Sequence, residues 1–322
     1  MSTFRQRVQA EARPGESWDE ASARLRGASA NNAAIEESEL ADCFISADGV
    51  STKDSRNFMD VALFRMSKRE NRAGEVIRYD LSDGYIEVKA GADGMASIWD
   101  YDIVLMLISH LTESMNLYKR GRGLMPSRLF TPHVSDILKF CRRGDGGNQS
   151  KRIESALDRL KGTTIKSVLH HPSRNTKGIT REVKSESLIS GYRVLSETLS
   201  GRVDRVEIEA PMWIYREVVE SHGAAVLTVS QDYFSIDSPI ARFIYRLARR
   251  AAGKSNAKWG FRTIYARTGL SCFKEFCRIL RRLIRSDSLP DYNLSEEAGL
   301  SGPQLIITYR NSAAESKPVD NS

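Results

Sequence analysis

Between residues 238 and 286 the chain carries thirteen Lys or Arg residues and a single acidic residue, Glu275. The formal charge of this window is +12, whereas the whole chain carries +7, so the remaining residues sum to −5. Apolar residues recur in the same window at the spacing of helices with one buried face. The window therefore predicts folded helices with concentrated positive charge, and a polyanion is the first partner to consider.

The segment 271–286 is the most regular of these helices. Its apolar residues share one face and are Phe273, Phe276, Cys277, Leu280, Leu283 and Ile284. Its cations share the other face and are Lys274, Arg278, Arg281, Arg282 and Arg285. Like charges at this spacing weaken a helix by about 0.2–0.5 kcal/mol per pair. We therefore expect DNA phosphates to offset the repulsion; a solvated, solubilising face is the alternative.

A second basic helix is predicted at 238–252, with Ser238 as its N-cap and Pro239 at its first position. In a helix–turn–helix the first helix crosses the DNA backbone. We therefore assign phosphate contacts to the cations of this helix and of the segment that follows it, which are Arg242, Arg246, Arg249, Arg262 and Arg267. Ser271 is expected to cap the next helix and to contact DNA.

One layout occurs twice along the chain. The later copy has a helix at 238–252, a strand at 259–262, a helix at 263–268, a helix at 271–286 and a hairpin at 289–310. The earlier copy has a helix at 98–118, a strand at 128–130, a helix from 132, a helix at 149–161 and a hairpin at 163–189. This order is that of a winged helix, whose second helix–turn–helix member enters the DNA major groove.

The earlier copy is less basic and has its own candidate DNA contacts. The helix residues outside the apolar stripe are Gln149, Lys151, Arg152, Ser155 and Arg159, and the hairpin tip adds Arg174 and Lys177. Gln and Arg can each make paired hydrogen bonds to base edges. Because Glu154 and Asp158 are mixed in, an ordinary solvated helix is the alternative. We expect the second copy to be the principal reader and the first to assist.

The predicted fold class is α+β, with two tandem winged-helix domains, an extra N-terminal hairpin at 76–89 and a disordered N-terminal segment. We expect disorder at 1–38, an N-terminal domain at 39–200, a C-terminal domain at 201–311 as the main DNA reader, and a disordered tail at 312–322. The longest apolar run, 103–108, is six residues, against roughly 20 for a bilayer span. Residues 1–10 have no apolar signal-peptide core, so we expect a cytoplasmic protein.

The sequence contains no motif that indicates an enzyme. It has no GxxxxGK[ST], HExxH or GxSxG pattern, and we expect neither catalysis nor a cofactor. The four cysteines are scattered and are expected to be buried, reduced thiols rather than metal ligands. Asp100 and Asp102 are expected to act as helix N-terminal acids that favour the macrodipole, because a separation of two residues would point them apart.

The chain resembles the plasmid replication initiator protein A family (RepA-like, tandem winged-helix initiators) in three separated segments, 94–103, 159–165 and 245–253. The segments occur in the same order as in that family. The resemblance covers about residues 40–310. It implies a DNA-binding plasmid replication initiator that recognises repeated sites (iterons) in double-stranded origin DNA, helps to open the origin, and recruits the host replicative helicase and chromosomal initiator. It also implies monomer–dimer self-association.

Two other functions are alternatives to this one. A winged-helix transcriptional repressor without an initiation role would make the same DNA contacts. A nicking enzyme or nuclease would need a positioned Tyr or a carboxylate–metal cluster, and the sequence has no histidine pair of the type that relaxases use.

Overall fold

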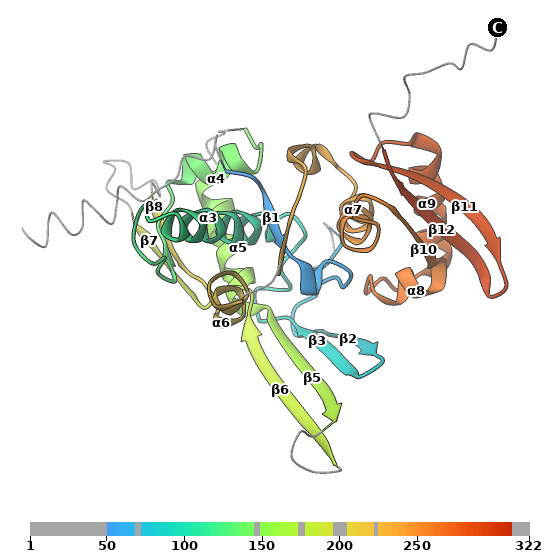
Figure 1. The fold of residues 1–322 in the computed structure, drawn as a ribbon, viewed down its shortest axis with the longest axis horizontal. Helices are drawn as coiled ribbons and strands as arrows, with labels where there is room; N and C mark the ends of the chain where they lie inside the picture. Colours follow the sequence, from blue (N-terminus) through green and yellow to red (C-terminus); the bar gives the residue numbers. More distant parts are fainter. Residues whose placement is uncertain are drawn as a thin grey trace, which may run out of the picture. The chain divides into compact units, whose positions relative to one another are not determined.

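The computed structural model describes residues 50–67, 72–144, 149–172, 178–195, 205–221 and 225–310 (Figure 1). The segment 1–38, the tail 312–322, and the hairpin-tip residues Arg174 and Lys177 lie outside these ranges. The described chain is a mixed α/β structure. Within it, no helix combines the length and the apolar character that a membrane crossing requires.

The secondary structure alternates short strands with helices. Up to residue 195 the elements are β1 (Lys53–Ser55), η2 (Arg56–Phe58), β2 (Val76–Leu81), β3 (Gly84–Lys89), α3 (Tyr101–Lys119), β4 (Leu129–Phe130), α4 (Val134–Phe140), α5 (Gln149–Gly162), β5 (Thr164–Pro172), β6 (Ile179–Ser187) and β7 (Gly191–Leu195). They continue with β8 (Arg205–Glu209), α6 (Met212–Tyr215), η3 (Arg216–Glu220), β9 (Val226–Thr228), η4 (Gln231–Ser235), α7 (Pro239–Ala251), β10 (Asn256–Gly260), α8 (Phe261–Ala266), α9 (Phe273–Ser286), β11 (Tyr292–Gly299) and β12 (Gly302–Tyr309).

Helix α3 is a core helix, as its apolar run predicts. Every residue from 101 to 109 is buried. Its start is tied down by a reciprocal pair, in which the Ser97 amide donates to Asp100 Oδ2 (2.8 Å) and the Asp100 amide donates to Ser97 Oγ (3.2 Å). This pair satisfies two of the amide groups that a helix N-terminus leaves without intrahelical partners.

The predicted early hairpin β5–β6 belongs to a larger antiparallel sheet of order β2-β3-β5-β6. Strand β3 runs close against β5, and a Cβ on Gly84 (φ +157°) would lie 1.9 Å from the Val168 carbonyl oxygen. Strand β4 does not join this sheet but pairs with β8 in the order β4-β8-β7. The predicted N-terminal hairpin is therefore the direct neighbour of β5, a nonlocal pairing that local periodicity does not reveal.

The predicted order of elements is observed from residue 239 to residue 309. Ser238 Oγ accepts the Ala241 amide (3.3 Å) and Pro239 opens α7, as predicted. Strand β10 adds to the terminal hairpin in a sheet of order β10-β12-β11. Helices α8 and α9 are joined by a turn at Gly269, whose φ of +66° favours glycine.

Two local predictions in this part need correction. Strand β10 covers Asn256–Gly260 rather than 259–262, because Phe261 is buried as the first residue of α8. Ser271 does not cap α9, since the N-cap is Cys272 and its side chain makes no capping hydrogen bond.

Strands pair across the predicted domain boundary at residue 200. Strand β7 precedes this position and β8 follows it, yet they pair along five residues. Strand β1 pairs with β9 in the same manner, with Lys53 opposite Thr228. A division at residue 200 would therefore cut a sheet, and the described residues all fall within one compact unit.

We predict a stability loss in mild acid that is caused by His110 on α3. Its ring lies 4.6 Å from the Phe130 ring, and burial lowers the pKa of His110 from 6.5 to about 4. Between these pH values the unfolded chain binds a proton that the folded chain does not, so stability falls as pH falls, by about 3 kcal/mol in total. Urea unfolding at pH 7 and pH 4.5 should show a smaller loss for His110→Phe than for the parent chain. The matched control is His170→Phe at an exposed position on β5, and an equal loss in all three proteins would contradict the assignment.

Candidate nucleic-acid interface

Helix α9 is amphipathic in the way its sequence predicts. Phe276 and Leu280 are fully buried and Leu283 is 7% exposed, whereas all five predicted cations of the other face are exposed. The apolar face packs against α7 and α8. The helix is thus held along one side and presents Lys274, Arg278, Arg281, Arg282 and Arg285 to solvent along the other.

Two of these arginines are bound to carboxylates. Arg278 donates to Glu275 one turn earlier (Nε–Oε2, 2.8 Å). Arg281 forms a two-point pair with Glu296 of β11 (Nε–Oε2, 2.9 Å; Nη2–Oε1, 2.8 Å). The Arg281 guanidinium lowers the pKa of Glu296 by hydrogen bonding. Glu296 lies outside the basic window, so counting charge within that window overstates the field of α9.

The other three cations of α9 have no ion pair with any residue in the described ranges. They are Lys274, Arg282 and Arg285. Near the start of the helix, Arg262 is exposed and its guanidinium lies 4.9 Å from the Phe273 ring centre. Ser271 is exposed beside it. These groups extend the cationic surface from α8 onto α9, as a contact with a polyanion requires.

Helix α5 presents a smaller polar surface. Lys151, Arg152 and Ser155 are exposed and Gln149 is half-buried. Arg159 departs from the prediction because it forms a two-point pair with Asp100 (Nε–Oδ2, 2.9 Å; Nη2–Oδ1, 2.9 Å), so in this structure its hydrogen-bonding groups face the protein. This pairing also raises the pKa of Arg159.

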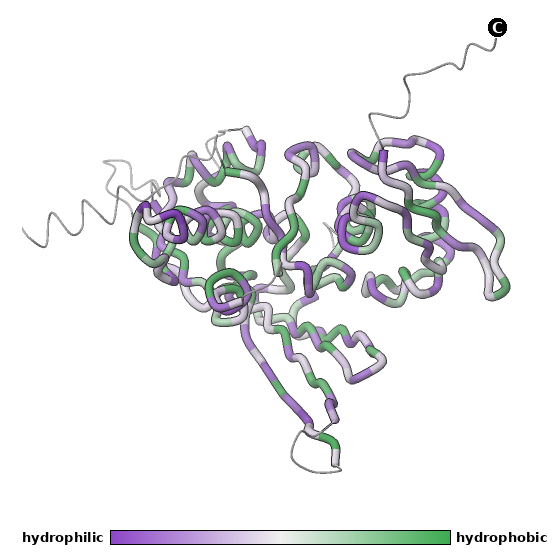
Figure 2. Tube along the Cα trace, in the orientation of Figure 1, coloured by the Kyte–Doolittle hydropathy of each residue, from purple (hydrophilic) through white to green (hydrophobic). Residues whose placement is uncertain are grey.

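The predicted phosphate contacts of α7 are the main correction. Arg242 is 4% exposed and Arg246 is 0% exposed, so neither guanidinium can reach a phosphate. Figure 2 shows hydrophilic residues among the hydrophobic ones along α7, yet every residue from 240 to 248 is buried. Arg249 is half-buried, and its Nε donates to the Thr228 carbonyl (2.6 Å). Arg267 is likewise half-buried and is paired with Asp60.

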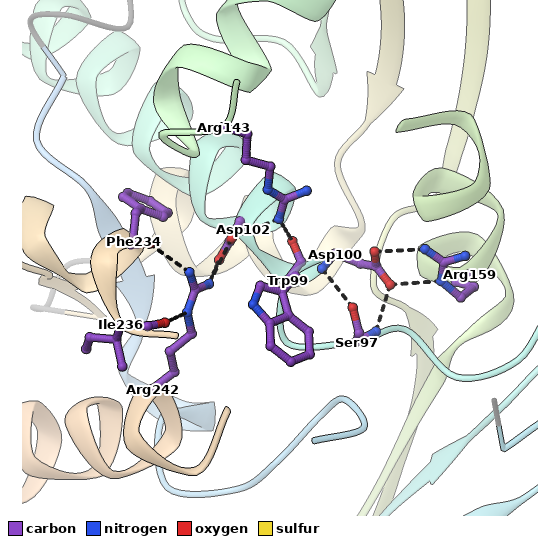
Figure 3. A network of polar contacts seen from close by, with 9 residues as sticks. All are labelled: Ser97, Trp99, Asp100, Asp102, Arg143, Arg159, Phe234, Ile236 and Arg242. Atoms are coloured by element: carbon purple, nitrogen blue, oxygen red, sulfur yellow. Dashed lines mark hydrogen bonds and ion pairs between the residues drawn. The ribbon is translucent and has the colours of Figure 1, made fainter. Parts of the chain in front are cut away.

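Each buried arginine of α7 has a carboxylate partner. Arg242 Nη1 donates to both oxygens of Asp102 (2.9 Å each), while its Nε and Nη2 donate to the Ile236 and Phe234 carbonyls (2.7 and 3.0 Å). Figure 3 shows this network, in which Arg143 Nη2 also reaches Asp102 (3.0 Å). Arg246 Nε donates to Asp54 Oδ2 (2.5 Å).

These pairings redefine Asp100 and Asp102. They do point apart, as expected, but each binds an arginine on another element instead of acting through the helix dipole alone. Burial raises the pKa of the Asp102 carboxyl, and the guanidiniums of Arg242 and Arg143 oppose that rise. A signal was present in the sequence, since an Asp within the largely apolar stretch 95–108 needs a buried partner.

The cysteines and the acids form no metal site in the described part of the chain. No three His, Cys, Asp or Glu residues gather there closely enough to hold an ion. Cys141 and Cys277 are buried free thiols, as expected, but Cys272 is exposed at the start of α9.

Comparisons with known proteins agree with the three resembling segments. The family model described as Replication initiator protein A matches residues 53–294. A protein of Wigglesworthia glossinidia brevipalpis named "Putative replication protein" is 31% identical over 257 residues, which cover 78% of this chain and 88% of that protein.

A solved structure shares the fold at much lower identity. The selenomethionine crystal structure of domains 2 and 3 of RctB is 11% identical, with a TM-score of 0.56, and the match covers 79% of this chain and 98% of that one. A second crystal structure of RctB domains 2–3 matches with a TM-score of 0.45 and 12% identity, over 77% of this chain and 95% of that one.

We predict that Arg246→Met lowers stability strongly. It leaves Asp54 uncompensated where both side chains are fully buried, and breaking such a pair costs about 3–5 kcal/mol. Urea unfolding should register that loss, and the double variant Asp54→Leu/Arg246→Met should recover most of it because no buried charge remains. If Arg246→Met instead kept full stability and weakened only DNA binding, the interior placement of Arg246 would be contradicted.

Proposed function

The chain belongs to the replication initiator protein A family, and from that membership we propose that it binds repeated double-stranded sites at a plasmid origin through two winged helices. In this proposal α9 is the principal reading helix and α5 the assistant. No catalytic step is assigned to the protein. Origin opening, recruitment of the host helicase and chromosomal initiator, and self-association belong to the proposal through the family alone.

The observation that carries the proposal is the arrangement around α9. A short helix, a glycine turn and an amphipathic helix are followed by an antiparallel hairpin, and β10 completes a three-stranded sheet with it. This order supports a winged helix, in which the second helix of the helix–turn–helix enters the major groove. Lys274, Arg282 and Arg285, which have no ion pair among the described residues, line the face that the groove would meet.

Ion pairs on the same face do not oppose this role. Arg278 and Arg281 are paired with Glu275 and Glu296 at exposed positions, where an ion pair contributes little because water and salt screen it. A phosphate or a guanine edge offers the same guanidinium an equivalent two-point partner. DNA binding would therefore replace the carboxylate partner of each arginine with a DNA group. The displaced carboxylates would remain beside the groove and repel phosphates in any other position.

The earlier copy supports the assistant role. Helices α4 and α5 and the hairpin β5–β6 follow in winged-helix order, although the hairpin is paired with β3 instead of β4. Lys151, Arg152 and Ser155 are exposed polar groups of α5 that can reach DNA without breaking an ion pair to a described residue. With Arg159 engaged by Asp100, α5 carries less available charge than α9.

A transcriptional repressor is the second candidate, because it would use the same contacts. The two functions separate in a cell that supplies the protein in trans. A plasmid with the origin but no copy of this gene should replicate there if the protein is an initiator. Failure to replicate, with binding to the origin intact, would favour the repressor.

We predict that Lys274→Ala/Arg282→Ala weakens specific DNA binding at least about tenfold, since each good base contact is worth about 1–3 kcal/mol. The probe is a duplex enriched by the full chain from a randomised library, and binding is measured at several salt concentrations. Each lost phosphate contact should also flatten the log–log salt slope by about 0.9. Arg216→Ala, at an exposed cation of η3, is the matched control. Unchanged affinity and slope for the double variant would remove α9 as the reader.

A further inference from the structure

Three consecutive residues at the start of α3 bind side chains from several other elements. Asp100 binds α5, Tyr101 binds the pair between β1 and α7, and Asp102 binds α7 together with the turn after α4. Successive residues on a helix lie about 100° apart, because there are 3.6 residues per turn. One helix start can therefore hold several elements that surround it.

The Asp100 contact fixes the first reading helix. Both carboxylate oxygens accept from Arg159 of α5 at 2.9 Å, and Oδ2 also accepts the Ser97 amide. Figure 3 shows Arg159 reaching this carboxylate from the neighbouring helix. A planar two-point pair restricts orientation as well as distance, so it holds α5 against the start of α3.

The other two residues fix α7. Tyr101 Oη donates to Asp54 Oδ1 (3.1 Å), and Asp54 in turn accepts from Arg246. The Arg246 guanidinium lies 4.7 Å from the Tyr101 ring centre and 5.0 Å from that of Phe64. Asp102 accepts hydrogen bonds from Arg242, which lies one turn before Arg246 on α7. All of these charged groups are buried, which makes their geometry far more restrictive than that of a surface pair.

Helix α7 transmits this position to the second reading helix. It packs against α9, and Tyr245 of α7 lies 5.9 Å from Tyr292 at the start of β11. A separate contact holds the turn before α9, where a Cβ on Gly269 would lie 2.9 Å from Ile77 Cδ1 and from Tyr79 Oη. The Ala62 amide also donates to the Arg267 carbonyl (3.0 Å).

We propose that residues 100–102 lock α5 and α9 in one relative position, so that the protein recognises two DNA half-sites only at one spacing. This inference rests on the proposed function. Each inserted base pair shifts one half-site by about 3.4 Å along the duplex and turns it by about 34°. A locked pair of reading helices cannot follow that displacement, whereas two helices joined by a loose interface can.

The test compares how far the affinity of each protein falls when the spacing between the two half-sites is increased; this fall is the spacing penalty. The probe is the duplex enriched by the full chain, and a second duplex carries two extra base pairs between the half-sites mapped by hydroxyl-radical footprinting. The parent chain should bind the extended duplex about 100-fold more weakly, because one half-site is lost. The variant Asp102→Leu/Arg242→Met replaces directional hydrogen bonds with non-directional apolar contact, and its penalty should fall below about tenfold, with weaker binding to the original duplex.

The controls separate the possible failures. Lys258→Met/Glu297→Leu removes an exposed pair within the C-terminal sheet (2.9 Å), and it should keep the parent's penalty. Urea unfolding checks that each variant is folded. If Asp102→Leu/Arg242→Met is not folded, Asp102→Asn, which keeps the shape of the side chain, is tested in its place, and its loss of affinity for the extended duplex is judged by the same threshold. The proposed lock is overturned if a folded Asp102 variant loses as much affinity for the extended duplex as the parent does. It is also overturned if the parent loses none. Failure to enrich any duplex overturns the proposed function and the lock with it.

Discussion

The described structure depends on two carboxylate–guanidinium pairs buried between α7 and the first part of the chain, Asp54–Arg246 and Asp102–Arg242. Removing such charges from water is expensive, and only close, fully hydrogen-bonded geometry offsets the loss. Arg242 meets this condition through Asp102 and two backbone carbonyls. Burial alone would lower its pKa, but the Asp102 carboxylate outweighs that effect and the pKa of Arg242 is raised. The Asp102–Arg242 pair therefore specifies where α7 sits, beyond what an apolar contact would do, whereas Arg246 keeps a buried Nη1 without a hydrogen-bond partner among the described residues.

Burial of these pairs changes what the basic window means. Arg242 and Arg246 are paired with acids from the first part of the chain, and Asp60 pairs with both Arg250 and Arg267, so that its single negative charge offsets one of the two. Some of the negative charge outside the window is therefore buried against the helices of the window and offsets their positive charge. The charge that remains available to DNA is concentrated on α9 and beside it. A net charge per segment indicates partners only when the positions of its counter-charges are known.

The sequence predicted the helices well because their signals are local. The apolar stripe of α9, the Ser238 cap of α7 and the glycine turn at Gly269 each act within a few residues. The partners of Arg242 and Arg246 are 140 and 192 residues away, and periodicity cannot identify them. The same limit applies to β5, whose pairing with β3 depends on a hairpin 75 or more residues earlier in the chain. Local patterns predicted which faces are exposed on α9, but on α7 no face is exposed between residues 240 and 248.

The two candidate reading helices are unequal for a reason that charge counts alone do not explain. Arg159 would be the strongest base-reading group of α5, and it is committed to Asp100. The corresponding arginines of α9 are paired at the surface, where a DNA group can replace the carboxylate. Because α5 is held in place through one of its own cations, that cation is not available to bind DNA. Helix α9 is positioned through its apolar face and through α7, so its cations remain available. The proposed stronger reader is therefore the helix that is attached mainly through its apolar face, with Arg281 bound to Glu296 of β11 at the surface.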